Sequence, residues 1–263
     1  MLTPVFSKPG PCTEKERKVK SKIPACGLGE AIGMIVYRVW YPALIRGHHN
    51  VASTYEFPVR IKFIEDWGAC NAPKWNVPNW IQCAKELEKE GVAAITTNCG
   101  LTGTMQEELA NAVNIPVFTS SLLQVPFVYR MLRKDKKVGI LIANEAAARA
   151  NDNELLRSCG IDESIPIVLY GMGEHQPDAN DSQFGVLSGR PVSDYDPKKV
   201  EEALVSLGNK MVAEHPDVGA IVLECTEMPL YAAAVREATG LLVFDSTTLV
   251  RYVYHAIVKK HYF

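Results

Sequence analysis

Short apolar runs alternate with longer amphipathic segments along this chain of 263 residues. Near-continuous runs of Val, Ile and Leu are typical of parallel strands buried on both faces, and mixed segments of ten or more residues favour covering helices. The predicted strands and helices outside the repeat described next are Glu30–Arg38, Pro58–Asp66, Lys136–Asn144 and Ile165–Gly171, and Pro78–Glu90 and Pro197–His215. The alternation predicts an α/β fold with parallel sheets flanked by helices.

One part of the pattern occurs twice. Gly91–Ser120 and Asp217–Ser246 align without a gap, and each predicts an apolar strand, a cysteine, an amphipathic helix and a second strand. Eight aligned positions are identical, namely Val92/Val218, Ala94/Ala220, Ile95/Ile221, Cys99/Cys225, Ala112/Ala238, Val117/Val243, Phe118/Phe244 and Ser120/Ser246. Roughly two identities are expected by chance over that length, so the match indicates an internal duplication. We therefore expect two pseudo-symmetric lobes with Cys99 and Cys225 at equivalent points.

The duplication extends to the strands that precede each copy of the repeat. Glu30–Arg38 in the first half corresponds to Lys136–Asn144 in the second, and both are apolar and carry a glycine, Gly33 and Gly139. Parallel sheets bind ligands beyond the carboxyl ends of their strands, where helix N-termini also point. An active site is thus expected in the cleft between the lobes, facing both cysteines. Residues 41–58 and 171–197 are too long for routine connections and are predicted to border that cleft.

Composition and charge narrow the function classes. A net charge of −2 gives no electrostatic reason to expect nucleic acid. The apolar runs are shorter than the roughly 20 residues that a membrane span needs, and residues 1–26 lack the apolar core of a secretory signal. We expect a cytoplasmic protein with a flexible N-terminal extension over residues 1–26. Its seven cysteines include no CxxC pair, which disfavours both a zinc site and a disulfide framework.

Two thiols at strand ends permit acid/base chemistry. A helix N-terminus lowers the pKa of a cysteine from about 8.5 and stabilises the thiolate. For cysteines in register across a duplication, we favour a catalytic role over simple packing. Glu224 and Glu227 are weaker candidates for auxiliary acids. Other weak signals are a glycine-rich stretch at 27–33, which precedes its strand and so argues against a dinucleotide loop, and a possible metal set of His48, His49, Glu174 and His175, which lacks helical ligand spacing.

Four short motifs carry a family resemblance. They are TTNCG at 96–100, VFTSSLLQVP at 117–126, LECTEMPLY at 223–231 and VFDS at 243–246. With them the chain resembles the aspartate/glutamate racemase superfamily over about Gly29–Tyr254. This group includes cofactor-independent racemases, maleate isomerase, arylmalonate decarboxylase and the algal dimethylsulfoniopropionate lyases, whose second cysteine motif LECTE is the most specific likeness.

The resemblance implies a first lobe of residues 27–122 plus 229–263 and a second lobe of residues 123–228. It also implies that Cys99 and Cys225 are the acid/base pair, that no cofactor or metal is used, and that the substrate is a small carboxylate. Residues expected to bind this substrate are Asn98, Gly100, Ser120, Ser121 and Thr226.

One position departs from the family pattern. Amino-acid racemases of this group carry an acidic residue at the end of the first strand, where this chain has Arg38, with Asn144 at the equivalent place in the second half. Arginine repels an ammonium group and favours an anion. Asn144 is expected either to line the cleft or to cap a helix. Arg38 thus argues against plain aspartate or glutamate racemisation. From the duplicated cysteines and the resemblance, the predicted function is a racemase or isomerase, with a dimethylsulfoniopropionate lyase or a non-catalytic anion-binding protein as alternatives. We expect a homo-oligomer.

Overall fold

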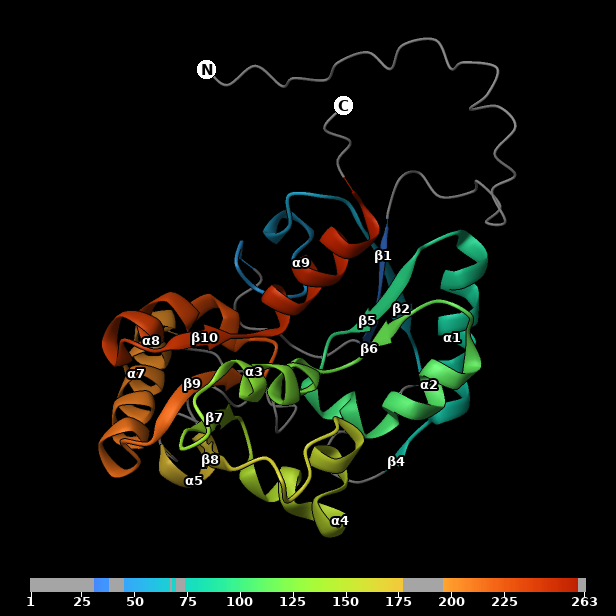
Figure 1. Ribbon diagram of the computed structural model, residues 1–263. Coiled ribbons are helices and arrows are strands. Elements are labelled where there is room, and N and C mark those ends of the chain that lie inside the picture. Colours follow the sequence, from blue (N-terminus) through green and yellow to red (C-terminus); the bar gives the residue numbers. More distant parts are fainter. Residues whose placement is uncertain (1–30, 38–44, 67, 70–73, 177–195, 260–263) are drawn as a thin grey trace, which may run out of the picture.

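The computed structural model describes residues 31–37, 45–66, 68–69, 74–176 and 196–259. Its two main sheets are each built of four parallel strands. The first runs β2 (Val59–Ile64), β1 (Ile32–Tyr37), β5 (Ala94–Thr97) and β6 (Val117–Phe118). The second runs β8 (Ile167–Gly171), β7 (Lys137–Ile142), β9 (Val218–Leu223) and β10 (Leu242–Phe244). Figure 1 shows them side by side with helices around them, which confirms the predicted two-lobed α/β fold.

The two sheets share one topology. In each, the strands that come first, second, third and fourth along the chain are arranged in the order 2-1-3-4. The register agrees as well, because Gly33 pairs with Ile95 in the first sheet and Gly139 with Ile221 in the second. The duplication seen in the sequence is thus a duplication of structure.

The repeated glycine has a packing reason in both sheets. A Cβ atom on Gly33 would lie 3.1 Å from Leu87 of helix α1 (Val77–Glu90), and one on Gly139 would lie 2.5 Å from Met211 of helix α7 (Pro197–Glu214). The missing side chain therefore lets a covering helix approach the central strand closely.

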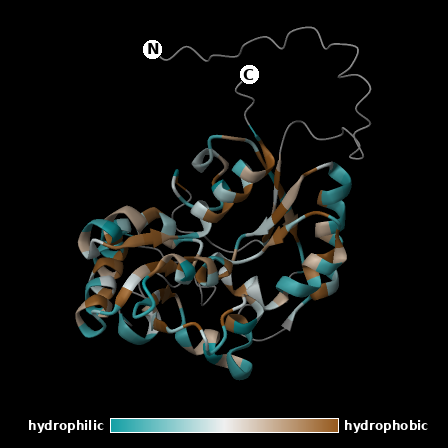
Figure 2. Cartoon of the chain, viewed as in Figure 1, coloured by the Kyte–Doolittle hydropathy of each residue, from teal (hydrophilic) through white to brown (hydrophobic). Residues whose placement is uncertain are grey.

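Apolar side chains cover both faces of each sheet. On β1, Ile35 packs with Trp80 of α1, and Met34 on the opposite face packs with Val250 of helix α9 (Ser246–Ile257). Figure 2 shows brown, hydrophobic strands inside and teal residues on the outer helices. Burial on both faces explains why the strands are nearly continuous apolar runs.

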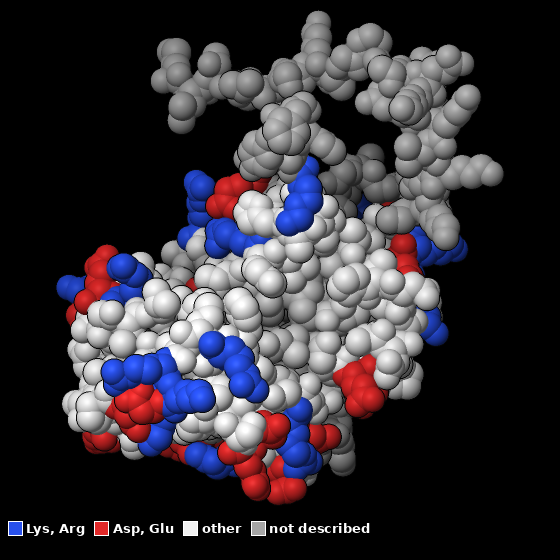
Figure 3. All heavy atoms as spheres, viewed as in Figure 1, with Lys and Arg blue, Asp and Glu red and all other residues white. Residues whose placement is uncertain are grey.

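The remaining described elements complete the lobes. They are β3 (Gly68–Ala69), β4 (Lys74–Trp75), α2 (Gln106–Ala112), α3 (Val125–Met131), α4 (Glu145–Ser158), α5 (Met172–His175), α8 (Ala232–Thr239) and the short 3-10 helices η2 (Ala52–Thr54), η3 (Gly100–Met105), η4 (Ser121–Gln124) and η6 (Met228–Tyr231). No helix in these ranges is long and apolar enough to cross a membrane. On the face in Figure 3, acidic and basic residues are intermixed.

One predicted boundary is wrong. The chain was expected to rejoin the first lobe at about Pro229, but β10 pairs with β9 and Val235 of α8 packs in the core beside α7. A strand, helix and strand form one crossover unit, so both strands of the repeat stay in one sheet. The return begins at Asp245, after which Leu249 and Val250 of α9 join the core around β1. The predicted N-terminal extension lies outside the described residues.

Candidate active site

Buried polar side chains gather where the parallel strands of both sheets end. Beyond β5 and β6 lie Asn98, Thr119, Ser120 and Ser121, and beyond β9 and β10 lie Glu224, Thr226, Glu227, Asp245, Ser246 and Thr247, all at most 5% exposed. Burying polar groups is costly unless they are bonded or serve a function. This concentration at the carboxyl edge marks the candidate site.

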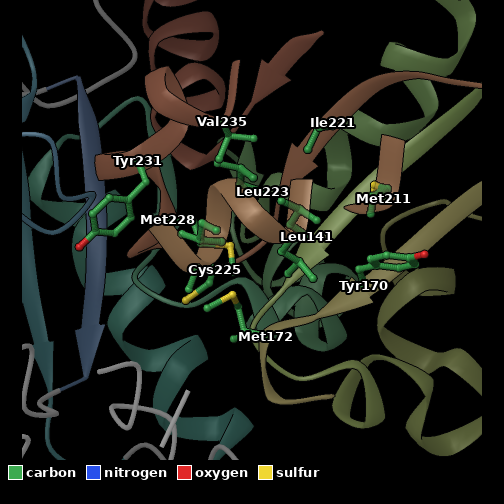
Figure 4. Close-up of a cluster of buried hydrophobic side chains, with 14 of the residues drawn as sticks. Leu141, Tyr170, Met172, Met211, Ile221, Leu223, Cys225, Met228, Tyr231 and Val235 are labelled. Carbon is green, nitrogen blue, oxygen red and sulfur yellow. The ribbon is translucent and has the colours of Figure 1, made fainter. Parts of the chain in front are cut away.

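Cys99 and Cys225 occupy the same place in the two halves. Each follows the third strand of its sheet and is buried, with 7% and 9% of its surface exposed. Each starts the same turn, since the carbonyl of Cys99 accepts from the Thr102 amide and that of Cys225 from the Met228 amide, both at 3.1 Å. Figure 4 shows Cys225 beside Met172 and Met228, at the margin of the second-lobe core. Local structure around the two thiols is therefore duplicated.

The two cysteine loops contact each other directly. The Thr226 hydroxyl donates to the Asn98 carbonyl at 2.8 Å, and the Ser121 hydroxyl donates to the Leu223 carbonyl at 2.7 Å. Thr226 thus bonds to the carbonyl of the residue before Cys99, and Ser121 bonds to the carbonyl two residues before Cys225. Gly100 also lies against Glu224, because a Cβ atom there would lie 2.5 Å from the Glu224 carbonyl oxygen. These contacts bring the loops of Cys99 and Cys225 together, as the predicted facing arrangement requires.

The other expected substrate ligands are engaged within the protein. The Asn98 side chain accepts from the Tyr37 amide at 3.2 Å and donates to the Tyr37 carbonyl at 3.1 Å. The Ser120 hydroxyl accepts from the Leu122 amide, which caps η4. Asn144 is exposed, and its side-chain oxygen caps α4 by accepting from the Ala147 amide. That bond is the helix-capping role expected as one of its alternatives.

The remaining candidates are Arg38 and the possible metal set of His48, His49, Glu174 and His175. Arg38 lies outside the described residues. Glu174 accepts from the first amides of α4, and His175 stacks on Tyr170, whereas His48 and His49 are buried in the first lobe. In the described ranges no three His, Cys, Asp or Glu side chains are grouped so that they could hold a metal ion.

Burial changes the acidity of groups at this edge. It raises the pKa of Glu227 to about 8, so this carboxyl is largely protonated at neutral pH. Burial also raises the pKa of Asp245, against bonds from Thr247 and Thr248 that lower it. A protonated carboxyl two residues after Cys225 can donate a hydrogen bond or hold a proton there.

Sequence reasoning missed a second layer of polar residues around Cys99. Thr102 donates to the Cys99 carbonyl at 2.6 Å, and a ring nitrogen of His49 lies 3.0 Å from the Thr97 carbonyl. The adjacent histidines were visible in the sequence. No local pattern showed that a loop between β1 and β2 would fold them into the protein.

Comparison with known proteins gives a consistent result. Residues 46–250 match the family model described as Asp/Glu/Hydantoin racemase. The chain is 29% identical to a dimethylsulfoniopropionate lyase of Durusdinium sp. clade D, covering 79% of this chain and 68% of that protein. It is 31% identical to dimethylsulfoniopropionate lyase 3 of Emiliania huxleyi, covering 86% of this chain and 54% of that protein. The chain thus spans between about half and two thirds of these relatives' length.

Two solved structures show the same fold. A mutant of arylmalonate decarboxylase in a sulfate-associated form has a TM-score of 0.59 at 17% identity, covering 87% of this chain and 94% of that one. An aspartate racemase homologue from Pyrococcus horikoshii OT3 has a TM-score of 0.53 at 18% identity, covering 86% and 99%. Likeness at these identities concerns the fold alone.

Proposed function

Because the chain belongs to the Asp/Glu/hydantoin racemase family, we propose that it is a cofactor-independent enzyme that moves a proton at the carbon next to a carboxylate. Cys99 and Cys225 are the proposed acid/base pair, and the substrate is a small carboxylate. The observation that carries this proposal is the pair of equivalent cysteine turns, joined through the bond from Thr226 to Asn98. One thiolate removes the proton and the second thiol serves the opposite face of the carbon.

The surroundings suit this chemistry. Removing a proton next to a carboxylate builds negative charge on the carboxylate oxygens, which preorganised donors in a buried site stabilise. The side chains of Asn98, Ser121 and Thr226 all donate to main-chain carbonyls. We therefore propose that backbone amides of the cysteine turns, with the protonated carboxyl of Glu227, supply donors to the substrate carboxylate. Gly100 has no side chain, which leaves room for Glu224 beside the first turn.

The first form of the proposed reaction is racemisation or isomerisation. The second thiol returns a proton to the carbon, so no atom is lost and the thiol and thiolate exchange roles. Two cysteines on equivalent strand ends favour this form, because proton removal and return on opposite faces need one group each.

β-Elimination is the second candidate, and the curated relatives favour it, since those quoted above are both named dimethylsulfoniopropionate lyases. One cysteine thiolate takes the proton from the carbon next to the carboxylate. The electron pair of that C–H bond forms a C=C bond, and the C–S bond breaks with its electrons on sulfur. The products of dimethylsulfoniopropionate are then acrylate and dimethyl sulfide, and the proton remains on the enzyme.

Replacing each cysteine tests the shared step. Cys99→Ser and Cys225→Ser are expected to abolish solvent deuterium incorporation into a substrate that the wild-type protein turns over. Cys83→Ser is the matched control, because this thiol is also 9% exposed but lies on α1 in the first-lobe core. Full exchange in both site variants would refute the assignment of the two cysteines as the acid/base pair.

The products separate the two reactions. Incubation with dimethylsulfoniopropionate and gas chromatography of the headspace detects dimethyl sulfide if the protein is a lyase. If none is released, and the optical rotation of a chiral carboxylic acid changes instead, the racemase form holds.

A further inference from the structure

The described part of the connection before β2, residues 45–58, places a histidine against the end of the strand that leads to Cys99. His49 is 1% exposed, with Nε2 lying 3.0 Å from the Thr97 carbonyl and Nδ1 2.9 Å from the Tyr55 hydroxyl. A carbonyl can only accept, so Nε2 carries the proton and Nδ1 accepts from Tyr55. Burial lowers the pKa of His49 to about 4, so the ring stays neutral at physiological pH. Both ring nitrogens are thus used in fixed roles.

Thr97, the residue that His49 holds, is the last of β5. Its hydroxyl lies 2.5 Å from the Thr102 hydroxyl, and Thr102 donates to the Cys99 carbonyl at 2.6 Å. The Thr97 carbonyl belongs to the peptide group that joins β5 to Asn98. Fixing this peptide group sets the direction in which the chain leaves the strand toward Cys99, two residues later.

The loop that carries His49 is itself braced. Arg251 of α9 donates to the Thr54 carbonyl at 2.9 Å, and the Thr54 hydroxyl donates to the His48 carbonyl at 2.7 Å. The same hydroxyl accepts from the Gly47 amide at 2.9 Å. The loop that holds the His49 imidazole against Thr97 is therefore fixed to α9, a helix of twelve residues.

We propose that His49 is a positioning residue, which holds the strand end carrying Cys99 in the orientation that proton transfer requires. The inference deepens the proposed function and rests on it for the role of Cys99. A neutral donor suits this task, because it holds the carbonyl without adding charge near a thiolate. A residue that served only to fill the core would use its apolar surface, and leucine could replace it.

The test compares three variants by the reactivity of each cysteine. His49→Leu removes the donor to Thr97, and His49→Gln offers an amide N–H near the position of Nε2. Tyr55→Phe removes the hydroxyl that bonds to Nδ1 and to the His49 carbonyl. Native protein is treated with iodoacetamide, and peptide mass spectrometry gives the alkylation rate of Cys99 and of Cys225 separately. Thermal unfolding is followed in parallel.

We expect His49→Leu to change the Cys99 rate about tenfold, since small displacements of a reacting group have effects of this order, and to leave Cys225 within about twofold. His49→Gln is expected to restore the Cys99 rate to within about threefold of wild type, and Tyr55→Phe to lie between the two. Equal changes at both cysteines, or no change at Cys99 in any variant, would overturn the proposal. If His49→Leu does not fold, Tyr55→Phe decides it, and an unchanged Cys99 rate or equal changes at both cysteines in that variant would overturn the proposal.

Alkylation needs no turnover, so the result can be read even if Cys99→Ser keeps full activity. In that case the proposed function fails, while the effect of His49 on the Cys99 thiol is still measured.

Discussion

Gly100→Ala tests whether the two cysteine loops need their close approach. The added Cβ would lie 2.5 Å from the Glu224 carbonyl oxygen, a separation that real Cβ atoms essentially never show, so one loop must move. Backbone strain does not contribute to the cost of the substitution, because Gly100 belongs to η3 and is not among the glycines with a positive φ. The perturbation is therefore steric and lies where the halves meet.

Its magnitude follows from two effects. Forcing a methyl group into a packed interior costs about 1 to 3 kcal/mol. Moving the loops apart also stretches the bond from Thr226 to Asn98, which contributes about 1 kcal/mol. We expect Gly100→Ala to lose about 2 to 4 kcal/mol of unfolding free energy, with a melting temperature lower by about 2 to 4 °C for each kcal/mol. Displacement of the cysteines is expected to reduce solvent deuterium exchange by about 100-fold.

Urea unfolding and deuterium exchange measure the two quantities on one preparation. Gly208→Ala is the control, because Gly208 lies in α7 and its Cβ would be 3.1 and 3.3 Å from methyl groups of Thr239 and Val235 in α8, two helices that carry neither cysteine. It is expected to keep full exchange. If Gly100→Ala unfolds at the wild-type urea concentration and keeps full activity, the loops are not in obligatory contact and the reasoning is refuted.

Three further predictions follow from the same site. Thr226→Val leaves the buried Asn98 carbonyl without its hydroxyl donor and is expected to cost about 1 to 3 kcal/mol in urea unfolding, with Thr226→Ser near wild type; equal values for the two would contradict this. Burial raises the pKa of Glu227 to about 8, above its unfolded value, so its contribution is complete below about pH 4.5 and is lost as the pH rises through 8. Glu227→Gln is expected to remove this loss between about pH 4.5 and pH 8 when the free energy of unfolding is measured across pH. The pKa values of His48 and His49 are lowered to about 3 and about 4, so their contribution is complete above about pH 6.5 and is lost on acidification toward pH 4. Replacing both histidines by Gln should reduce the loss of unfolding free energy below about pH 6.5, and an unchanged loss would refute this prediction.

Much of the fold could be predicted because strands buried on both faces leave a clear apolar pattern. The run Glu30–Arg38 predicted β1, and Pro197–His215 predicted α7 to within a residue at its C-terminus. The boundary at Pro229 failed for a different reason. Membership of a sheet depends on which strand pairs with β10, and neither the composition of Leu242–Phe244 nor its length specifies that partner.

The candidate site was predicted only in part, for reasons that also concern long-range contacts. Equivalent positions in a duplication located Cys99 and Cys225, because the turn after the strand is a local structure. The bonds of Asn98 to Tyr37 and of His49 to Thr97 join residues far apart in the chain. Side-chain type shows that a residue can donate or accept, but the partner is fixed by the packing of β1 beside β5.

The differences between the halves explain how a duplicated frame gives one site. Two identical loops meeting about a pseudo-twofold axis would place identical side chains against each other. Here Gly100 stands opposite the backbone of Glu224, and its counterpart Thr226 bonds to the carbonyl of Asn98. Because Gly100 has no side chain, the backbone of Glu224 can pack against it, and Thr226 of that same second half supplies the hydroxyl that bonds to Asn98. Close approach of the two cysteine loops thus depends on the asymmetry, and so a substitution that made the halves more alike at these positions would separate the thiols.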